Sequence, residues 1–147
     1  MKLLYMWFKD GGIKEQGISF TGKYSFKTTV KYKDNENNID KISIEIKQND
    51  KYIEGFFGEN IIDVICVVGE NGAGKTTLLK RKLFHDFSQG RNSNLQPIVI
   101  YEDDNNKLHY TSYKYVNEIV PKLETNFKIT IENCDIEDIK KHFAILY

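Results

Sequence analysis

Residues 69–77 have the sequence Gly-Glu-Asn-Gly-Ala-Gly-Lys-Thr-Thr, in which both the residue types and their spacing are suited to binding phosphate groups. The pattern is G-x-x-x-x-G-K-[ST], that of glycine-rich loops that bind polyphosphates. Glycines allow backbone angles closed to other residues, so successive N–H groups can point inward at an anion. Lys75 offers an ammonium to the β- and γ-phosphates, Thr76 a hydroxyl to Mg²⁺, and Thr77 a hydroxyl to the α-phosphate. The expected nucleotide contacts are Asn71, Gly72, Ala73, Gly74, Lys75, Thr76 and Thr77.

The sequence on either side supplies the elements that such a loop needs. Residues 61–68 form a nearly continuous β-branched run, typical of a strand covered on both faces in a parallel sheet. Residues 75–87 place Leu79, Leu83 and Phe87 four apart, the spacing of an amphipathic helix. A helix that begins at the loop directs its positive end at the phosphates. This context favours triphosphate binding over an incidental glycine-rich turn.

The residues before the loop have the pattern of a small antiparallel sheet. Residues 3–8 are an apolar and aromatic run that predicts a buried strand, and residues 24–32 predict a strand that faces solvent. Residues 39–46 alternate apolar and polar side chains, as a half-buried strand does. We therefore expect one domain over the whole chain. Its antiparallel β part is residues 1–58, and residues 59–147 carry the loop, its strand and helix, and later strands.

Acidic residues follow a second apolar run and offer an alternative chemistry. Residues 97–102 precede Asp103 and Asp104, much as carboxylates follow a strand in Mg²⁺-dependent NTPases. The same acids begin a turn-forming cluster, which favours a hairpin with residues 107–113. Glu102 also lies only 27 positions after the lysine of the loop. The hairpin is the preferred interpretation, and Glu102 with Asp103 are the alternative catalytic carboxylates.

The last third of the chain has weaker patterns. Residues 116–126 are ambiguous, and Pro121 argues against a long helix there. Residues 127–132 alternate and predict another half-buried strand, whereas residues 135–142 are expected to form a short capped helix. The apolar residues 143–147 resemble the start of a further buried strand. We expect them either to pair within this domain or to belong to a longer polypeptide.

Composition narrows the function classes. The chain has 147 residues, 40% of them hydrophobic, and 21 basic residues balance 21 acidic ones, so no overall field favours nucleic acid or a membrane surface. No stretch approaches the roughly 20 apolar residues of a membrane helix, which indicates a cytoplasmic protein. Cys66 and Cys134 are expected to be reduced, structural thiols. His85, His109 and His142 lack the spacing of metal ligands.

The interior of the loop resembles the Walker A motif of ABC-type ATPases, including their SMC-like and RecF-like branch, in which an Asn occupies the position of Asn71. The similarity covers residues 1–80, from the first strand through the Phe-Phe-Gly-Glu-Asn-Ile stretch at 56–61 to the loop. It points to bacterial AAA-family ATPases of SMC/RecF type, many of them linked to anti-phage defence. The resemblance implies an α/β P-loop fold, ATP with Mg²⁺, and a head-to-head homodimer with ATP between the two heads.

The chain also departs from that family. Lys9-Asp10-Gly11-Gly12 replaces the family's Asn, aromatic and basic residue, and the signature motif, the switch His and a convincing Walker B are missing. We therefore interpret the chain as the N-terminal segment of a longer ATPase, in which the Walker strand lies in a mainly parallel sheet beside an antiparallel β-layer. The alternatives are a nucleotide-regulated binding module without turnover and a small complete NTPase that uses Glu102 to Asp104. The partner, nucleic acid or effector protein, is left open.

Overall fold

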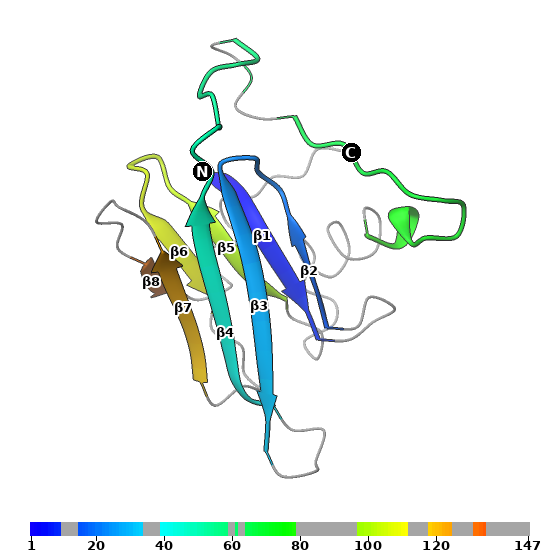
Figure 1. Cartoon of the computed structure of the whole chain (residues 1–147), viewed down its shortest axis with the longest axis vertical. Coiled ribbons are helices and arrows are strands. Elements are labelled where there is room, and N and C mark those ends of the chain that lie inside the picture. Colours follow the sequence, from blue (N-terminus) through cyan, green and yellow to red (C-terminus); the bar gives the residue numbers. More distant parts are fainter. Residues whose placement is uncertain are drawn as a thin grey trace.

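The computed structural model describes residues 1–9, 15–33, 39–58, 61, 64–78 and 97–111, and the backbone of 118–124 and 131–134. Within these residues the chain is built mainly from β-strands in two sheets (Figure 1). The strands are β1 (Lys2–Phe8), β2 (Gln16–Ser19), β3 (Tyr24–Tyr32), β4 (Ile39–Gln48), β5 (Ile98–Glu102), β6 (Leu108–Thr111), β7 (Glu118–Glu124) and β8 (Ile131–Cys134).

The sheets are mixed and mostly antiparallel. The larger has the order β2-β1-β5-β6-β8, and the smaller has the order β3-β4-β7. Strand β1 pairs antiparallel with both β2 and β5, and β5 pairs antiparallel with β6. The parallel pairs are β4 with β7 and β6 with β8, each between strands distant in sequence.

The main core lies between the two sheets. Its members are buried apolar side chains from β1, β4, β5 and β6, together with Tyr24 at the start of β3. Ile42, Ile44 and Ile46 are all fully buried, because alternate residues of a strand point to the same face. Burying one such side chain stabilises the fold by roughly 1.5–3 kcal/mol. The alternation seen in the sequence of β4 therefore predicts correctly which of its faces is buried.

The opposite face of the larger sheet is also covered. Met6 and Phe8 of β1 and Val99 of β5 form a second cluster there with Leu78, which is 5% exposed, and Val67 packs against it. Val67 and Leu78 both come from the segment that carries the glycine-rich loop. This packing attaches the loop to the sheet through the residues just before and just after it.

Several predicted elements are confirmed. The run at 3–8 is β1, residues 24–32 are β3, and the alternating run at 39–46 lies within β4. The hairpin expected between 97–102 and 107–113 is formed by β5 and β6, which pair as Tyr101 with His109.

The expected α/β fold is wrong for the described residues, which are nearly all β. The strand predicted at 61–68 is not in either sheet: the described residues 61 and 64–68 are irregular. Val64 is 56% and Val68 84% exposed, although a central strand would bury both. Apolar β-branched residues form a strand only where a neighbour pairs with their backbone, and the neighbours of β1 are β2 and β5.

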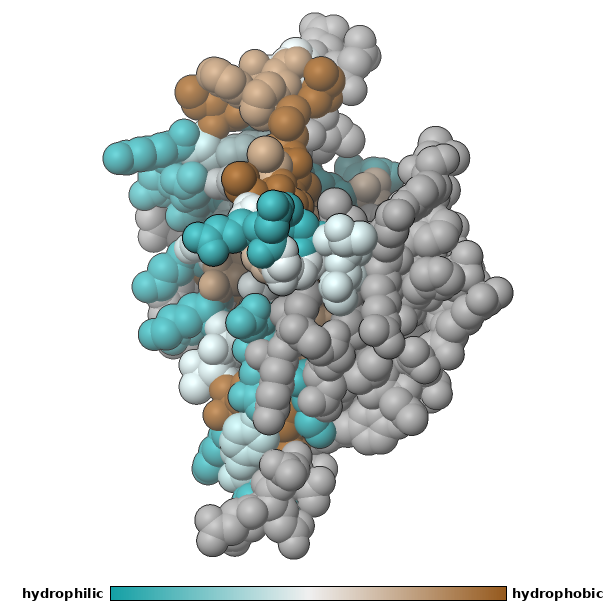
Figure 2. All heavy atoms as spheres, turned by 90° about the vertical axis from the view of Figure 1, so that its right-hand side faces the viewer, coloured by the Kyte–Doolittle hydropathy of each residue, from teal (hydrophilic) through white to brown (hydrophobic). Residues whose placement is uncertain are grey.

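Exposed apolar side chains continue upstream of this run. Ile53 is 64%, Phe56 69% and Phe57 46% exposed, in the segment that follows β4. Figure 2 shows hydrophobic atoms gathered at the upper end of the molecule, where Figure 1 places this segment. Cys66 was expected to be a structural thiol within the strand at 61–68, but it lies in the irregular segment and is exposed.

The predictions for the second half of the chain are met only in part. The helix expected at 75–87 is described through Leu78, whose amide donates to the carbonyl of Gly74 at 2.8 Å. The ambiguous residues around Pro121 form strand β7, and β8 shares residues 131 and 132 with the strand predicted at 127–132. Residues 79–96, 127–130 and 135–147 lie outside the described part, with His85, His142 and the predicted C-terminal elements. No helix among the described residues is long and apolar enough to cross a membrane.

Candidate phosphate-binding loop

Two glycines set the backbone path of the loop. Gly72 has φ of 85° and Gly74 has φ of 87°, a left-handed conformation that residues with a side chain rarely adopt. Open space surrounds the position that a Cβ would take at either residue. The glycines are therefore required by the backbone conformation and not by crowding. Between them, the amide of Ala73 donates to the carbonyl of Glu70 at 3.1 Å and closes a turn.

The side chain of Lys75 folds back across the loop. Its Nζ donates to the carbonyl oxygens of Gly69 at 2.5 Å and of Glu70 at 2.7 Å. These bonds hold the ammonium within the ring of residues 69–75 instead of leaving it extended in solvent. A positive charge that is already placed loses less conformational entropy when it binds an anion.

The first helical turn adds further donors. Lys75, Thr76 and Thr77 begin this turn, and the first N–H groups of a helix have no acceptor within it. Their partial positive charge favours an anion at this end. Leu78 closes the turn and is buried in the second core cluster, which fixes the turn against the larger sheet.

The loop presents amide and ammonium donors, which are groups that polyphosphates accept, and a threonine hydroxyl, which is a ligand type that Mg²⁺ accepts. Thr76 is exposed, so its hydroxyl is accessible as one ligand of an octahedral ion. Mg²⁺ ordinarily takes its remaining ligands from phosphate oxygens, water and one or two carboxylates. The described residues contain no group of three or more His, Cys, Asp or Glu side chains that could hold a metal ion. Thr76 is thus the one predicted metal ligand that the described loop presents.

A hollow of 290 Å³ opens beside the loop. Gln16 and Ile18 of strand β2 line one part of it, and Val67 and Val68 line another. The rest of the lining comes from the loop and the first helical turn, namely Ala73, Gly74, Lys75 and Leu78. Sequence reasoning missed this hollow, because β2 and the loop are brought together only by the packing on the larger sheet.

Glu102, the first alternative carboxylate, is engaged elsewhere. Its side chain is 7% exposed, and its Oε1 accepts a hydrogen bond from Lys23 Nζ at 2.7 Å and a longer one from the Tyr24 hydroxyl at 3.4 Å. Burial alone would lower the pKa of Lys23, but the hydrogen bond and charge of Glu102 outweigh burial and raise that pKa above its ordinary value. Burial, and then the charge of Glu102, raise the pKa of Tyr24.

Asp103, the second alternative carboxylate, stabilises the hairpin turn. Its Oδ1 accepts the amides of Asn105 and Lys107, both at 2.9 Å, and its Oδ2 lies 3.0 Å from His109 Nε2. The bond to His109 and those to the two amides lower the pKa of Asp103. These contacts explain why the turn forms, as the Asp-Asp-Asn-Asn sequence predicts.

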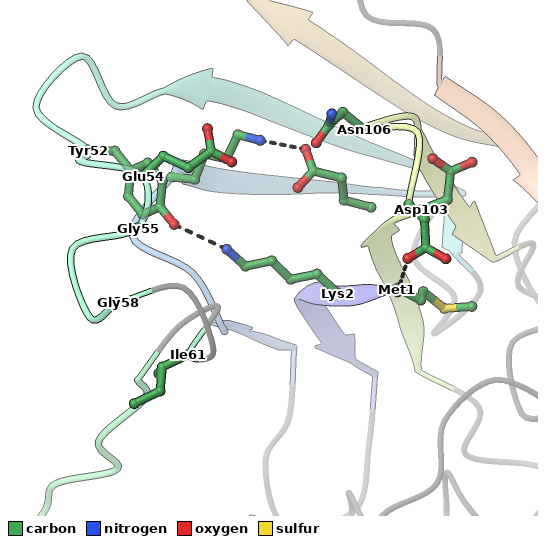
Figure 3. Close-up of a pocket in the computed structure, with 12 residues that line it drawn as sticks. Met1, Lys2, Tyr52, Glu54, Gly55, Gly58, Ile61, Asp103 and Asn106 are labelled. Carbon is green, nitrogen blue, oxygen red and sulfur yellow. Dashed lines mark hydrogen bonds and ion pairs between the residues drawn. The ribbon is translucent and has the colours of Figure 1, made fainter.

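Glu102 and Asp103 line a separate hollow of 270 Å³, to which the phosphate loop contributes no residue (Figure 3). Lys2 and Tyr52 face each other across this hollow, with the Lys2 Nζ and the Tyr52 hydroxyl 3.3 Å apart. Figure 1 places the β5–β6 turn and the loop on opposite sides of strand β1. The tertiary structure thus brings the loop residues together with β2 and leaves the two candidate carboxylates apart from them.

Comparisons with protein-family models, with curated proteins and with solved structures find no match. The functional assignment therefore depends on the loop's own residues and geometry, and on the sequence resemblance described above.

Proposed function

We propose that this chain binds Mg-ATP through residues 69–77, as the N-terminal part of an SMC/RecF-like ATPase of the bacterial cytoplasm. The observation that carries the proposal is the Lys75 ammonium, held across a loop whose two central glycines have positive φ. A fixed ammonium next to the backbone amides of a glycine-rich loop is suited to a polyphosphate.

Each loop residue has a role in this proposal. The amides of Asn71, Gly72 and Gly74 would donate to the β-phosphate, and that of Ala73 would join them on exchanging the carbonyl of Glu70 for a phosphate oxygen. Lys75 would neutralise charge on the β- and γ-phosphates. Thr76 contributes its hydroxyl to Mg²⁺, and Thr77 reaches the α-phosphate. When it is bound, Mg²⁺ supplies further charge neutralisation on the phosphates.

Hydrolysis in the longer protein would proceed by in-line attack of water on the γ-phosphate, with charge stabilised by the lysine and the metal. The carboxylate that orients this water would come from polypeptide beyond the described residues. In the proposed assembly two such heads meet with ATP between them, and the partner they serve is a nucleic acid or an effector protein.

Titration calorimetry with ATP in the presence of Mg²⁺ tests the binding claim. Lys75→Ala removes the loop cation, and we expect the affinity to fall roughly 10- to 100-fold, the range for a hydrogen bond to a charged group. Lys27→Ala is the matched control, because Lys27 lies exposed on β3, away from the loop. Equal affinity of the Lys75→Ala variant and the wild type would refute the proposal.

The second candidate is a nucleotide-binding module that does not turn over ATP. It is favoured by the engagement of Glu102 with Lys23 and of Asp103 within its own turn. Phosphate release from this chain, measured with and without Asp103→Ala, separates it from the small complete NTPase. Turnover that disappears in the variant while ATP still binds would establish the small NTPase. Binding without turnover supports the module or the incomplete ATPase.

A further inference from the structure

The hollow beside the phosphate loop differs from the loop in its chemistry. Its wall is apolar at Ile18, Val67 and Val68, whereas the loop presents amides and an ammonium. Ala73, Gly74 and Lys75 belong to the loop and also line this hollow. If a ligand binds the loop through its phosphates, the rest of the ligand would therefore lie in a less polar space than the phosphates do.

Val68 is 84% exposed, the largest exposed fraction among the exposed large apolar residues of the described chain. It lies directly before the first glycine of the loop and lines the hollow. Ile18, on the other side, packs partly against the second core cluster, which fixes its position. Two apolar side chains that flank an open space can contact a flat, weakly hydrated ring system.

Gln16 is the polar group of this wall outside the loop. It lies on the same face of β2 as Ile18, two residues away, and is exposed. Among the described residues, its side-chain amide makes no hydrogen bond. An amide offers a donor and an acceptor together, and this pair matches the N6 amino group and N7 of adenine, whereas the same edge of guanine presents two acceptors, N7 and O6.

We propose that this hollow receives the adenine of the nucleotide, with Gln16 as a residue that determines base specificity and with Val68 and Ile18 in contact with the ring. The inference depends on the proposed function, since the phosphates of the same ligand occupy the loop. It adds that the site selects an adenine nucleotide and does not bind the triphosphate chain alone.

Calorimetry with three probes, each with Mg²⁺, tests this inference: ATP, GTP and inorganic tripolyphosphate. We expect the wild type to bind ATP most tightly. Gln16→Ala should weaken ATP binding about threefold to tenfold, as the loss of one hydrogen bond does, and leave tripolyphosphate binding unchanged. Gln48→Ala, on β4 and outside the hollow, is the matched control and should change neither affinity.

Val68→Asn is the second variant, because it makes the wall polar at a side chain too exposed to matter for folding. It too should weaken ATP binding and spare tripolyphosphate. The inference is overturned if ATP binds through Lys75 but neither variant affects it, or if the wild type binds ATP and GTP equally. The proposed function survives both of these results. If the wild type binds none of the three probes, the proposed function itself fails and the inference falls with it.

Discussion

Removing one partner of the ion pair between Lys23 and Glu102 is expected to lower the stability of the fold. Lys23 precedes β3 in the smaller sheet and Glu102 ends β5 in the larger one, so their bond of 2.7 Å joins the two sheets. The side chains are 15% and 7% exposed. Replacing Lys23 by Met leaves the Glu102 carboxylate buried and removes the hydrogen bond from Lys23. The 3.4 Å hydrogen bond from the Tyr24 hydroxyl is kept.

The expected loss follows from this burial. Removing one partner of a buried ion pair costs about 3–5 kcal/mol, because the other charge stays desolvated without compensation. We expect the lower end, about 3 kcal/mol, because the pair borders an open hollow. For a chain of this length, that loss lowers the melting temperature by roughly 10 °C. The double variant Lys23→Met with Glu102→Gln removes both charges and should recover a substantial part of the loss.

The pH dependence has a definite sign. The pKa of Lys23 is raised in the folded protein, so its contribution is complete below the ordinary lysine value of 10.5. The contribution is lost as the pH rises through the higher, folded pKa. The difference in unfolding free energy between wild type and Lys23→Met should therefore be constant from neutral pH to about pH 9 and shrink in stronger alkali.

Urea unfolding followed by the fluorescence of Trp7, the chain's single tryptophan and a buried one, measures these differences. Lys27→Met is the matched control, since Lys27 lies exposed on the same sheet and should lose less than about 0.5 kcal/mol. The reasoning is refuted if Lys23→Met loses no more than this control. It is also refuted if the effects of the Lys23 and Glu102 substitutions simply add.

Two further predictions concern the hairpin turn and the exposed apolar segment. Asp103→Asn should destabilise the fold at neutral pH, because the lowered pKa of Asp103 reports bonds that favour its charged form; this contribution is lost as the pH falls through that pKa. The stabilities of variant and wild type should thus approach each other as the pH falls from the ordinary value of 3.8 through the lowered pKa, and a constant difference would contradict this. Phe56→Ser should reduce the binding of a hydrophobic dye, because Phe56 is 69% exposed, and should change stability by less than about 0.5 kcal/mol. A large loss of stability would instead mean that Phe56 contributes more than its edge-on contact with the ring of Phe57.

Local patterns predicted the elements whose formation depends on neighbours in sequence. The alternation along 39–46 places Ile42, Ile44 and Ile46 on one face of β4, and all three are buried. The acidic turn after Glu102 predicted the β5–β6 hairpin, because its hydrogen bonds join residues within a few positions. Gly72 and Gly74 of the loop likewise adopt the positive φ that glycine permits.

The run at 61–68 shows where such reasoning fails. Its composition suits a strand buried on both faces, but a strand also needs backbone partners, and only the packing of distant segments can supply them. In the described structure β1 pairs with β2 and β5, and the apolar run is left exposed. For the same reason, the sequence offered no signal for the parallel pairing of β4 with β7.

The residues of the candidate site also fall into two groups, those that the sequence predicted and those that only the tertiary structure brings together. The sequence alone determined the loop, since its glycines, lysine and threonines lie within nine consecutive residues. Only the tertiary structure set Gln16 and Ile18 beside it and paired Glu102 with a lysine 79 positions away. The physical reason is range: turns and loops form from bonds between near neighbours, whereas hollows and buried ion pairs arise where sheet packing brings distant residues together.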